Sequence, residues 1–190
     1  MIASKITDLI GNTPILKLKM KNNDWNVFLK LEKFNPGGSM KDRMALNMIE
    51  EAEKSGQLKP GGTIIESSSG NTAIGLAIAS AIKGYHFIAV VDHHASKEKI
   101  DMIKAYGAEI VVVGDGYKAN EVAVIEREKT AKRMSEEMEN AFFPNQAYNF
   151  NNRAAYIDTL ADELINDITT INSFYAAIGT GGSACGTAMG

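Results

Sequence analysis

The chain has 190 residues, of which 45% are hydrophobic and 23% are charged, and its formal net charge is −3. This balance is typical of a globular protein with a substantial core, and it supplies no basic field for a nucleic-acid backbone. The longest apolar stretch, residues 73–82, is too short to span a bilayer, and the first residues lack the pattern of a secretion signal. The single cysteine, Cys185, excludes an internal disulfide and a cysteine-rich metal site. We therefore expect a cytoplasmic protein that binds no membrane, nucleic acid or metal.

Two short extended segments, residues 14–19 and 26–32, come first and are predicted strands. From Arg43 the apolar period changes to that of an amphipathic helix, which Gly56 follows as a cap. The chain then alternates strands with helices. The predicted strands are 63–66, 87–91 and 109–113, and the predicted helices are 72–82 and 97–106. This alternation predicts an α/β fold with a parallel sheet and crossover helices.

The remaining segments are predicted to be mostly helical. Residues 120–139 carry mixed charges and one apolar stripe, which is typical of a helix with a solvated face. An asparagine-rich linker leads to a second helix whose stripe includes Leu160 and Leu164. Residues 174–178 are a predicted buried strand, followed by the glycine-rich stretch 179–190.

A turn-forming segment, residues 35–43, lies between a predicted strand and a helix. Pro36 and two glycines favour a turn, and Ser39 with Asp42 is the pattern of a capping pair that places Lys41 in the first helical turn. The field at a helix N-terminus favours the neutral amine, which a Schiff-base lysine needs. Taken alone, this motif favours the simpler interpretation of Lys41 as a surface lysine.

Two further loops are candidate anion sites. Residues 66–72 place three serines and Asn71 before a buried helix, where free backbone N–H groups suit a carboxylate or phosphate. Residues 179–184 combine glycines that admit a phosphate with the hydroxyls of Thr180 and Ser183, and they also match a dinucleotide fingerprint weakly. We expect all three loops to follow strands, and a lysine with two anion loops would suit pyridoxal phosphate and an amino-acid substrate.

Four motifs, in this order and spacing, resemble those of the cysteine synthase and cystathionine β-synthase family of pyridoxal-phosphate enzymes. They are residues 11–14, 35–43, 68–72 and 179–183. The resemblance implies a two-lobed fold with mainly parallel sheets, similar to the tryptophan synthase β fold (fold type II). Residues 43–146 would form the smaller lobe, while residues 1–42 and 147–190 would form part of the larger, cofactor-binding lobe.

The resemblance also implies a role for each motif. Lys41 would hold pyridoxal 5'-phosphate as an aldimine and move the Cα proton, and Asn71 would bind the ring oxygen of the cofactor. The implied ligands of the substrate carboxylate are Ser68, Ser69, Thr72 and Gln146. The implied phosphate cradle is Gly179, Thr180, Gly181, Gly182 and Ser183. The implied reaction is β-replacement on O-acetylserine or O-phosphoserine through an aminoacrylate, in a homodimer that acts on a small amino-acid substrate.

Several positions depart from the usual family pattern. Ser67 stands where a proline is usual, residues 91–94 replace a common Met-Pro pair, Ala147 displaces an aromatic residue, and Arg153 follows Asn152 in place of proline. These departures favour a branch that resembles diaminopropionate synthase and uses an amino-acid nitrogen as nucleophile. The same motifs are also compatible with a serine or threonine dehydratase, or with a non-catalytic fragment that only binds a ligand.

The stretch after Gly179 is expected to lack the helix that should cover the phosphate loop. In the resembling family, the residue that contacts the pyridine nitrogen also lies well beyond this position. We therefore expect the 190 residues to be the first portion of a longer enzyme, and to bind the cofactor poorly or be inactive alone.

Overall fold

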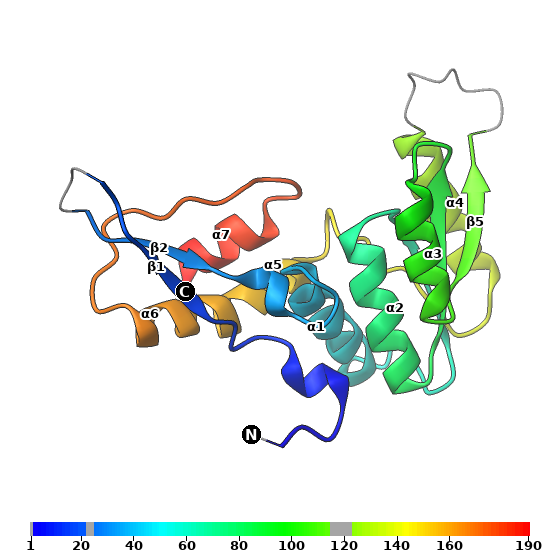
Figure 1. The fold of residues 1–190 in the computed structure, drawn as a ribbon. Helices are drawn as coiled ribbons and strands as arrows, with labels where there is room; N and C mark the ends of the chain where they lie inside the picture. The colour runs from blue at the N-terminus through cyan, green and yellow to red at the C-terminus, as the bar shows by residue number, and fades with distance from the viewer. Residues whose placement is uncertain (1, 22–24, 115–122) are drawn as a thin grey trace.

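The computed structural model describes residues 2–21, 25–114 and 123–190, and a parallel sheet dominates one end of it (Figure 1). The strand order is β5-β4-β3-β6, and every pair is parallel. The strands are β3 (Thr63–Ser67), β4 (His86–Asp92), β5 (Glu109–Val113) and β6 (Ala141–Phe142). The predicted α/β class and the parallel sheet are therefore confirmed, whereas β6 has only two residues and was not predicted.

Helices cover both faces of this sheet because successive strand residues point in opposite directions. Ile64 packs in a buried cluster with helices α1 (Lys41–Lys54), α2 (Asn71–Lys83) and α3 (Lys97–Ala105). The next residue, Ile65, packs on the other face against Ala131 of helix α4 (Val124–Glu137). Helix α4 begins later than the predicted segment 120–139, of which residues 120–122 lie outside the described residues.

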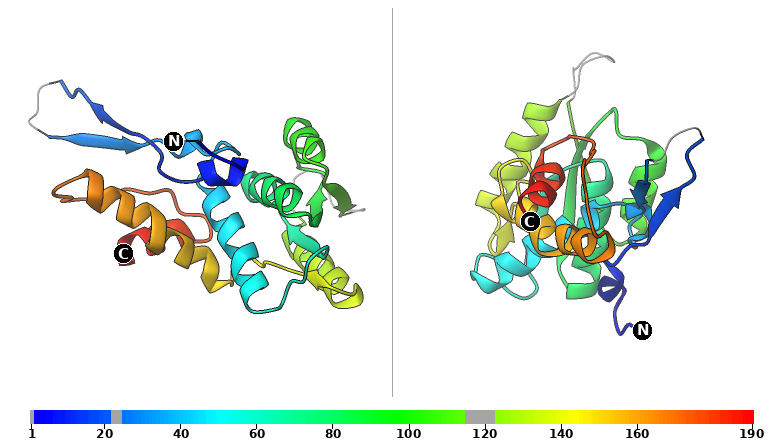
Figure 2. Two further views of the ribbon diagram at one scale, coloured as in Figure 1. Left: turned by 90° about the horizontal axis from the view of Figure 1, so that it is seen from below. Right: turned by 90° about the vertical axis from the view of Figure 1, so that its left-hand side faces the viewer.

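Helix α1 joins the sheet to the rest of the molecule. Its residues Ala45 and Ile49 belong to the cluster on the sheet, whereas Met44 and Met48 pack against Tyr156 and its neighbours. The two sets lie on different faces of one helix. Helix α1 therefore lies between the sheet and the helices around Tyr156 and packs against both (Figure 2). The division into lobes at residues 43 and 146 stays a prediction. Helix α1 packs against buried residues from both predicted lobes: the sheet on one face and Tyr156 with its neighbours on the other.

The other end combines a hairpin with helices. A short 3-10 turn (Ile6–Leu9) precedes the antiparallel strands β1 (Ile15–Leu18) and β2 (Val27–Lys30), and a second 3-10 turn (Glu32–Phe34) follows them. Helix α5 (Phe150–Tyr156) continues through a π-helical turn (Ile157–Ala161) into α6 (Asp162–Asp167), and α7 (Gly182–Met189) comes last. Within the described ranges, no helix is both long enough and apolar enough to cross a bilayer.

Two expectations about the last part of the chain were wrong. Residues 174–178 form no strand and are exposed, with Tyr175 at 90% of its full accessibility. Their apolar pattern alone could not identify a neighbouring strand to pair with, and none of the described strands pairs with them. In addition, α7 is the helix that the glycine-rich stretch was expected to lack. A Cβ at Gly186 would collide with the backbone of Arg153, so close packing on α5 supports a helix whose composition disfavours one.

Candidate active site

Lys41 is the first residue of α1, which confirms its predicted place in the first helical turn. The backbone N–H of Lys41 donates to Ser39 Oγ at 3.2 Å, whereas Asp42 accepts from the backbone N–H of Gly37. The predicted capping pair of Ser39 with Asp42 is therefore wrong, because Asp42 folds back onto the preceding turn. A Cβ at Gly37 would collide with the Asp42 carboxylate, which explains the glycine at this position.

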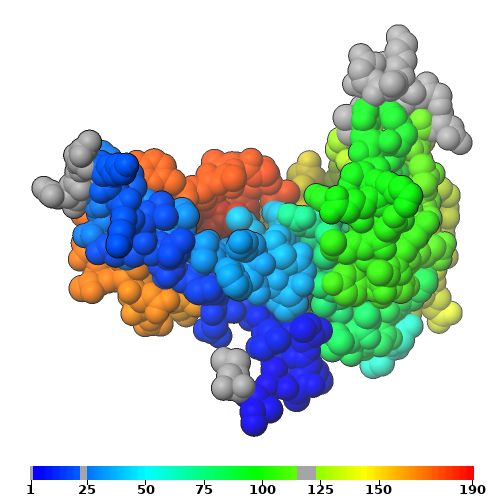
Figure 3. Space-filling view, viewed as in Figure 1, coloured from blue at the N-terminus to red at the C-terminus, as the bar shows by residue number. Residues whose placement is uncertain are grey.

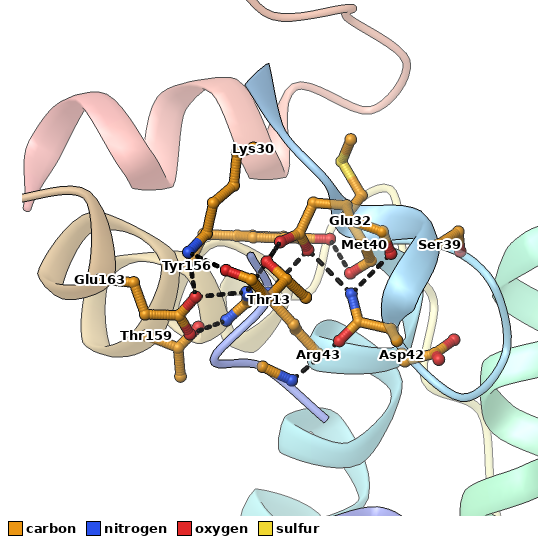
Figure 4. Close-up of polar contacts among 12 residues, drawn as sticks. Thr13, Lys30, Glu32, Ser39, Met40, Asp42, Arg43, Tyr156, Thr159 and Glu163 are labelled. Atoms are coloured by element: carbon orange, nitrogen blue, oxygen red, sulfur yellow. Dashed lines mark hydrogen bonds and ion pairs between the residues drawn. The ribbon is translucent and has the colours of Figure 1, made fainter. Parts of the chain in front are cut away.

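The turn that carries Lys41 is held from two sides. The buried hydroxyl of Tyr156 donates to the carbonyl oxygen of Met40 at 3.0 Å (Figure 4). On the other side, a Cβ at Gly75 would lie 3.2 Å from Cα of Asp42, so α2 packs directly against this turn. Lys41 is half-buried, and this burial lowers the pKa of its amine. The shift is in the direction of the neutral amine, the form that a nucleophilic lysine requires.

A buried ion cluster lies two residues after Lys41. Arg43, whose side chain is 1% exposed, binds Glu32 at 2.8 Å and Glu163 at 2.6 Å (Figure 4). Lys30 binds the other oxygen of Glu163 at 2.7 Å, and Thr13 donates to Glu32 at 2.6 Å. The cluster therefore ties the 11–14 motif, the end of β2 and α6 to the first turn of α1. Neither glutamate carries a local motif that sequence analysis could have recognised.

The second loop brings together two predicted site residues that are far apart in the sequence. Thr72 Oγ1 donates to Oε1 of Gln146 at 2.6 Å. This bond orients the Gln146 amide so that its NH₂ group remains available as a donor. Ser68 is buried and accepts from the backbone N–H of Gly70 at 3.3 Å, whereas Ser69 is half-buried and Asn71 is exposed.

The start of α2 offers free backbone donors beside these side chains. The first helical hydrogen bond here runs from Ile74 N to Gly70 O, so the preceding N–H groups have no acceptor within the helix. Such N–H groups and the positive end of the helix dipole favour an anion. The loop is therefore chemically suited to the carboxylate of an amino acid.

Gln146 is connected to the third loop by a residue that sequence analysis did not identify as functional. The side chain of Asn152 is buried, and its Nδ2 donates to the Gln146 carbonyl oxygen at 2.7 Å and to Thr180 Oγ1 at 3.1 Å. A Cβ at Gly182 would collide with the same amide. Asn152 stands out in the sequence only as a member of the asparagine-rich linker and as the residue before Arg153, where the resembling family often has proline, and neither signal predicts this role.

The third loop differs from its prediction in one respect and matches the chemistry of a phosphate site in another. It does not follow a strand, because residues 174–178 have no regular secondary structure. Gly181 has φ of +85°, a left-handed conformation that favours glycine, and α7 starts at the next residue. Its first helical bond runs from Cys185 N to Gly181 O, which leaves the preceding N–H groups free for an anion.

Contacts link the three loops to one another: α2 packs on the Lys41 turn through Gly75, and Asn152 joins Gln146 to Thr180. Figure 3 shows the surface hollowed between the red C-terminal segment and the green segment of α2 and α3, with the light-blue segment that leads into α1 at the floor. A half-buried lysine and two helix N-termini with free donors are the groups that pyridoxal phosphate and an amino acid would require. The residues present therefore fit this cofactor.

The family described as "Pyridoxal-phosphate dependent enzyme" matches residues 6–190. The chain belongs to the pyridoxal-phosphate dependent enzyme family. Within the family, a protein named putative cysteine synthase from Sinorhizobium fredii is 46% identical over 187 residues, which are 98% of this chain and 55% of that protein.

Solved structures of family members agree with this membership. A hydrogen sulfide-producing enzyme from Fusobacterium nucleatum superposes with a TM-score of 0.90 at 40% identity. An O-acetylserine dependent cystathionine β-synthase from Helicobacter pylori does so with a TM-score of 0.89 at 35% identity. Both comparisons cover 100% of this chain, and 61% and 62% of the solved chains. The chain thus spans a little over half the length of the relatives it matches.

Proposed function

We propose that this chain carries the lysine, substrate-carboxylate and phosphate sites of a transferase that performs β-replacement on an O-activated serine. In the net reaction, a nucleophile such as sulfide forms a bond to the β-carbon, and acetate or phosphate leaves with the electron pair of the broken C–O bond. The observation that carries the proposal is the contact between Thr72 and Gln146 beside the start of α2, the helix that packs on the turn carrying Lys41. The names of the relatives from S. fredii and H. pylori support the choice of cysteine synthase chemistry.

Lys41 is the residue that would hold the cofactor and move the proton at the substrate Cα. Pyridoxal phosphate, when bound, supplies the electron sink that makes this proton removable. The burial that lowers the pKa of Lys41 favours the neutral amine, which can both attach to a carbonyl and accept a proton. The contacts from Tyr156 and from α2 hold the backbone of the turn that carries this lysine in place.

The two anion loops would orient the ligands. Residues Ser68, Ser69, Thr72 and Gln146 would bind the substrate carboxylate, with the free N–H groups of α2 as further donors. Asn71 would bind the ring oxygen of the cofactor. Residues 179–183 would hold its phosphate at the start of α7. Two anchored anions at fixed positions would align the substrate Cα with Lys41.

A second candidate nucleophile is an amino-acid nitrogen, as in an enzyme similar to diaminopropionate synthase. The observation that favours it lies after β4, where His93 and His94 are exposed and their rings lie 4.2 Å apart. The buried carboxylate of Asp92 accepts from the backbone N–H of His94 at 3.0 Å and thereby orders this turn. Polar rings at this edge of the sheet would suit a larger, charged nucleophile better than sulfide.

The test is a substrate matrix with the cofactor-loaded protein. O-acetylserine, O-phosphoserine and serine are each combined with sulfide or with an amino acid, and the products are identified by mass spectrometry. The proposal predicts replacement products from at least one O-activated serine and none from Lys41→Ala. Pyruvate as the main product would instead indicate a dehydratase, that is, a lyase. Cofactor binding without turnover of any pair would indicate a non-catalytic protein.

We also propose a homodimer in the cytoplasm, as the resemblance to cysteine synthases implies. The hairpin of β1 and β2 exposes several apolar side chains that a second copy could cover, among them Leu16 and Leu29. Light scattering on the purified protein tests the oligomeric state. A mass that equals one chain at all concentrations would contradict the dimer.

A further inference from the structure

The peptide groups of Gln146 are held on both sides by buried side chains. Glu66, at 2% exposure near the end of β3, accepts from the Gln146 backbone N–H at 3.1 Å through Oε2. Asn152 donates to the carbonyl oxygen of the same residue at 2.7 Å. Thr72 also donates to the side chain of Gln146. Hydrogen bonds therefore hold Gln146 at its backbone N–H, its carbonyl oxygen and its side-chain amide.

Glu66 also holds the neighbouring loop. Its other carboxylate oxygen, Oε1, accepts from the backbone N–H of Ser67 at 2.8 Å. One carboxylate thus joins the first residues of the 67–72 loop to Gln146, which lies 80 positions later in the chain. These are the two segments that the proposed function assigns to the substrate carboxylate.

The geometry requires two acceptors on one side chain. A carboxylate offers an acceptor oxygen to each N–H group, whereas the isosteric amide of glutamine offers only one and would place its NH₂ against the other donor. A buried carboxylate is costly: burial raises the pKa of Glu66 to about 7, although the bonds from Gln146 and Ser67 oppose this shift. Glu128 on α4 carries a like charge, which adds to the cost of burying the Glu66 carboxylate and also raises the pKa of Glu66.

We propose that Glu66 is a positioning residue that fixes Gln146 against the 67–72 loop and thereby sets the affinity of the site for the substrate carboxylate. This inference rests on the proposed function, because it assumes that both segments bind that carboxylate. Glu66 itself does not touch the substrate: it is buried behind the two loops and acts through their backbones.

The test compares Glu66→Gln with Glu53→Gln. Glu53 is a matched control because it also accepts two hydrogen bonds, from Lys83 at 2.9 Å and from Tyr85 at 2.8 Å, near the far end of α1. The probes are L-alanine, which has the carboxylate but no leaving group, and L-alaninamide, which lacks the carboxylate. Binding of each probe to the cofactor-loaded protein is measured by the change in cofactor absorbance, and cofactor affinity is measured separately by titration of the cofactor-free protein.

Glu66→Gln is expected to weaken L-alanine binding about tenfold or more, which corresponds to one lost hydrogen bond to a charged group. Binding of L-alaninamide and of pyridoxal phosphate is expected to stay unchanged, and Glu53→Gln is expected to change none of the three. Unchanged L-alanine binding in Glu66→Gln would overturn the inference. An equal loss for both probes would also overturn it, since it would indicate a merely structural role.

If Glu66→Gln does not fold, the variant Glu66→Asp tests the positioning role of Glu66. Glu66→Asp keeps two acceptor oxygens on a shorter side chain, and it should show a partial loss that is selective for L-alanine. A non-selective loss would overturn the inference. The proposed function has its own test in the wild-type protein. Cofactor uptake without any preference for L-alanine over L-alaninamide would refute the proposed function, whatever the variants show.

Discussion

Asn152 Nδ2 lies 2.7 Å from the carbonyl oxygen of Gln146 and 3.1 Å from Thr180 Oγ1. A single buried amide at the start of α5 therefore connects the loop proposed to bind the substrate with the loop proposed to bind the phosphate. Both amide hydrogens are used, and Gly182 packs against the same group. The relative position of the two loops thus depends on one side chain.

Asn152→Ala should weaken both the fold and cofactor binding. Loss of two hydrogen bonds from a buried group is expected to lower the free energy of unfolding by about 1–3 kcal/mol. It should also lower the affinity for pyridoxal phosphate, because Thr180 loses its anchor. Urea denaturation and cofactor titration measure the two effects. Asn151→Ala, one residue earlier, is the control, and equal behaviour of the two variants would contradict this role of Asn152.

Thr72→Val should raise the KM for the O-activated serine with a smaller effect on kcat. The variant keeps the shape of the side chain but cannot donate to Gln146 Oε1, so the amide is no longer oriented. One neutral hydrogen bond corresponds to a change of about three- to tenfold. Steady-state kinetics provides the measurement, with Thr72→Ser as a control that retains the donor. A KM in Thr72→Val that matches Thr72→Ser would show that the bond has no role.

Arg43→Met should be among the most destabilising substitutions in the chain. Removal of the guanidinium leaves the carboxylates of Glu32 and Glu163 without their shared partner at a buried position. Breaking a buried pair in this way costs about 3–5 kcal/mol. Arg133→Met is the control, because its pair with Glu137 is exposed on both sides and should be worth less than about 1 kcal/mol. Similar losses in the two variants, measured by urea denaturation, would contradict the account.

Glu163 should make the protein sensitive to acid. Burial raises the pKa of this carboxyl, but hydrogen bonds from Arg43 and Lys30 outweigh burial and lower it from 4.5 to about 2. The stabilisation is therefore fully present above pH 4.5 and is lost as the pH falls from there towards about 2. In urea denaturation at a series of pH values, the stability gap between wild type and Glu163→Gln should narrow over this interval. A gap that stays constant would contradict the prediction.

Local signals in the sequence were sufficient for most of the sheet region. Alternation of apolar periods identified β3, β4, β5 and the helices between them to within about one residue at each end, because each of these elements is continuous. The position of Lys41 followed from the turn residues before it. The pairing of Ser39 with Asp42 failed because Gly37 offers Asp42 a nearer donor, which a spacing rule does not consider.

The remaining features depend on contacts between distant segments. Helix α7 forms from glycine, alanine and serine because Gly186 allows it to pack closely on α5, and intrinsic propensity alone predicts no helix there. Residues 174–178 have the composition of a strand but no pairing partner among the described strands. The hydrogen bonds that join Gln146 to Glu66 and to Asn152 span 80 and 6 positions in the sequence. Neither Glu66 nor Asn152 lies in a sequence motif that predicts its bond. Their recognition required the three-dimensional arrangement.

The central claim is that Lys41 is the attachment point of pyridoxal phosphate. The direct measurement is borohydride reduction of the cofactor-loaded protein, followed by proteolysis and mass spectrometry of the labelled peptide. The account predicts a stable cofactor label on Lys41, and no labelled peptide in Lys41→Ala. A label on another lysine, or a protein that binds the cofactor without any label on Lys41, would contradict it.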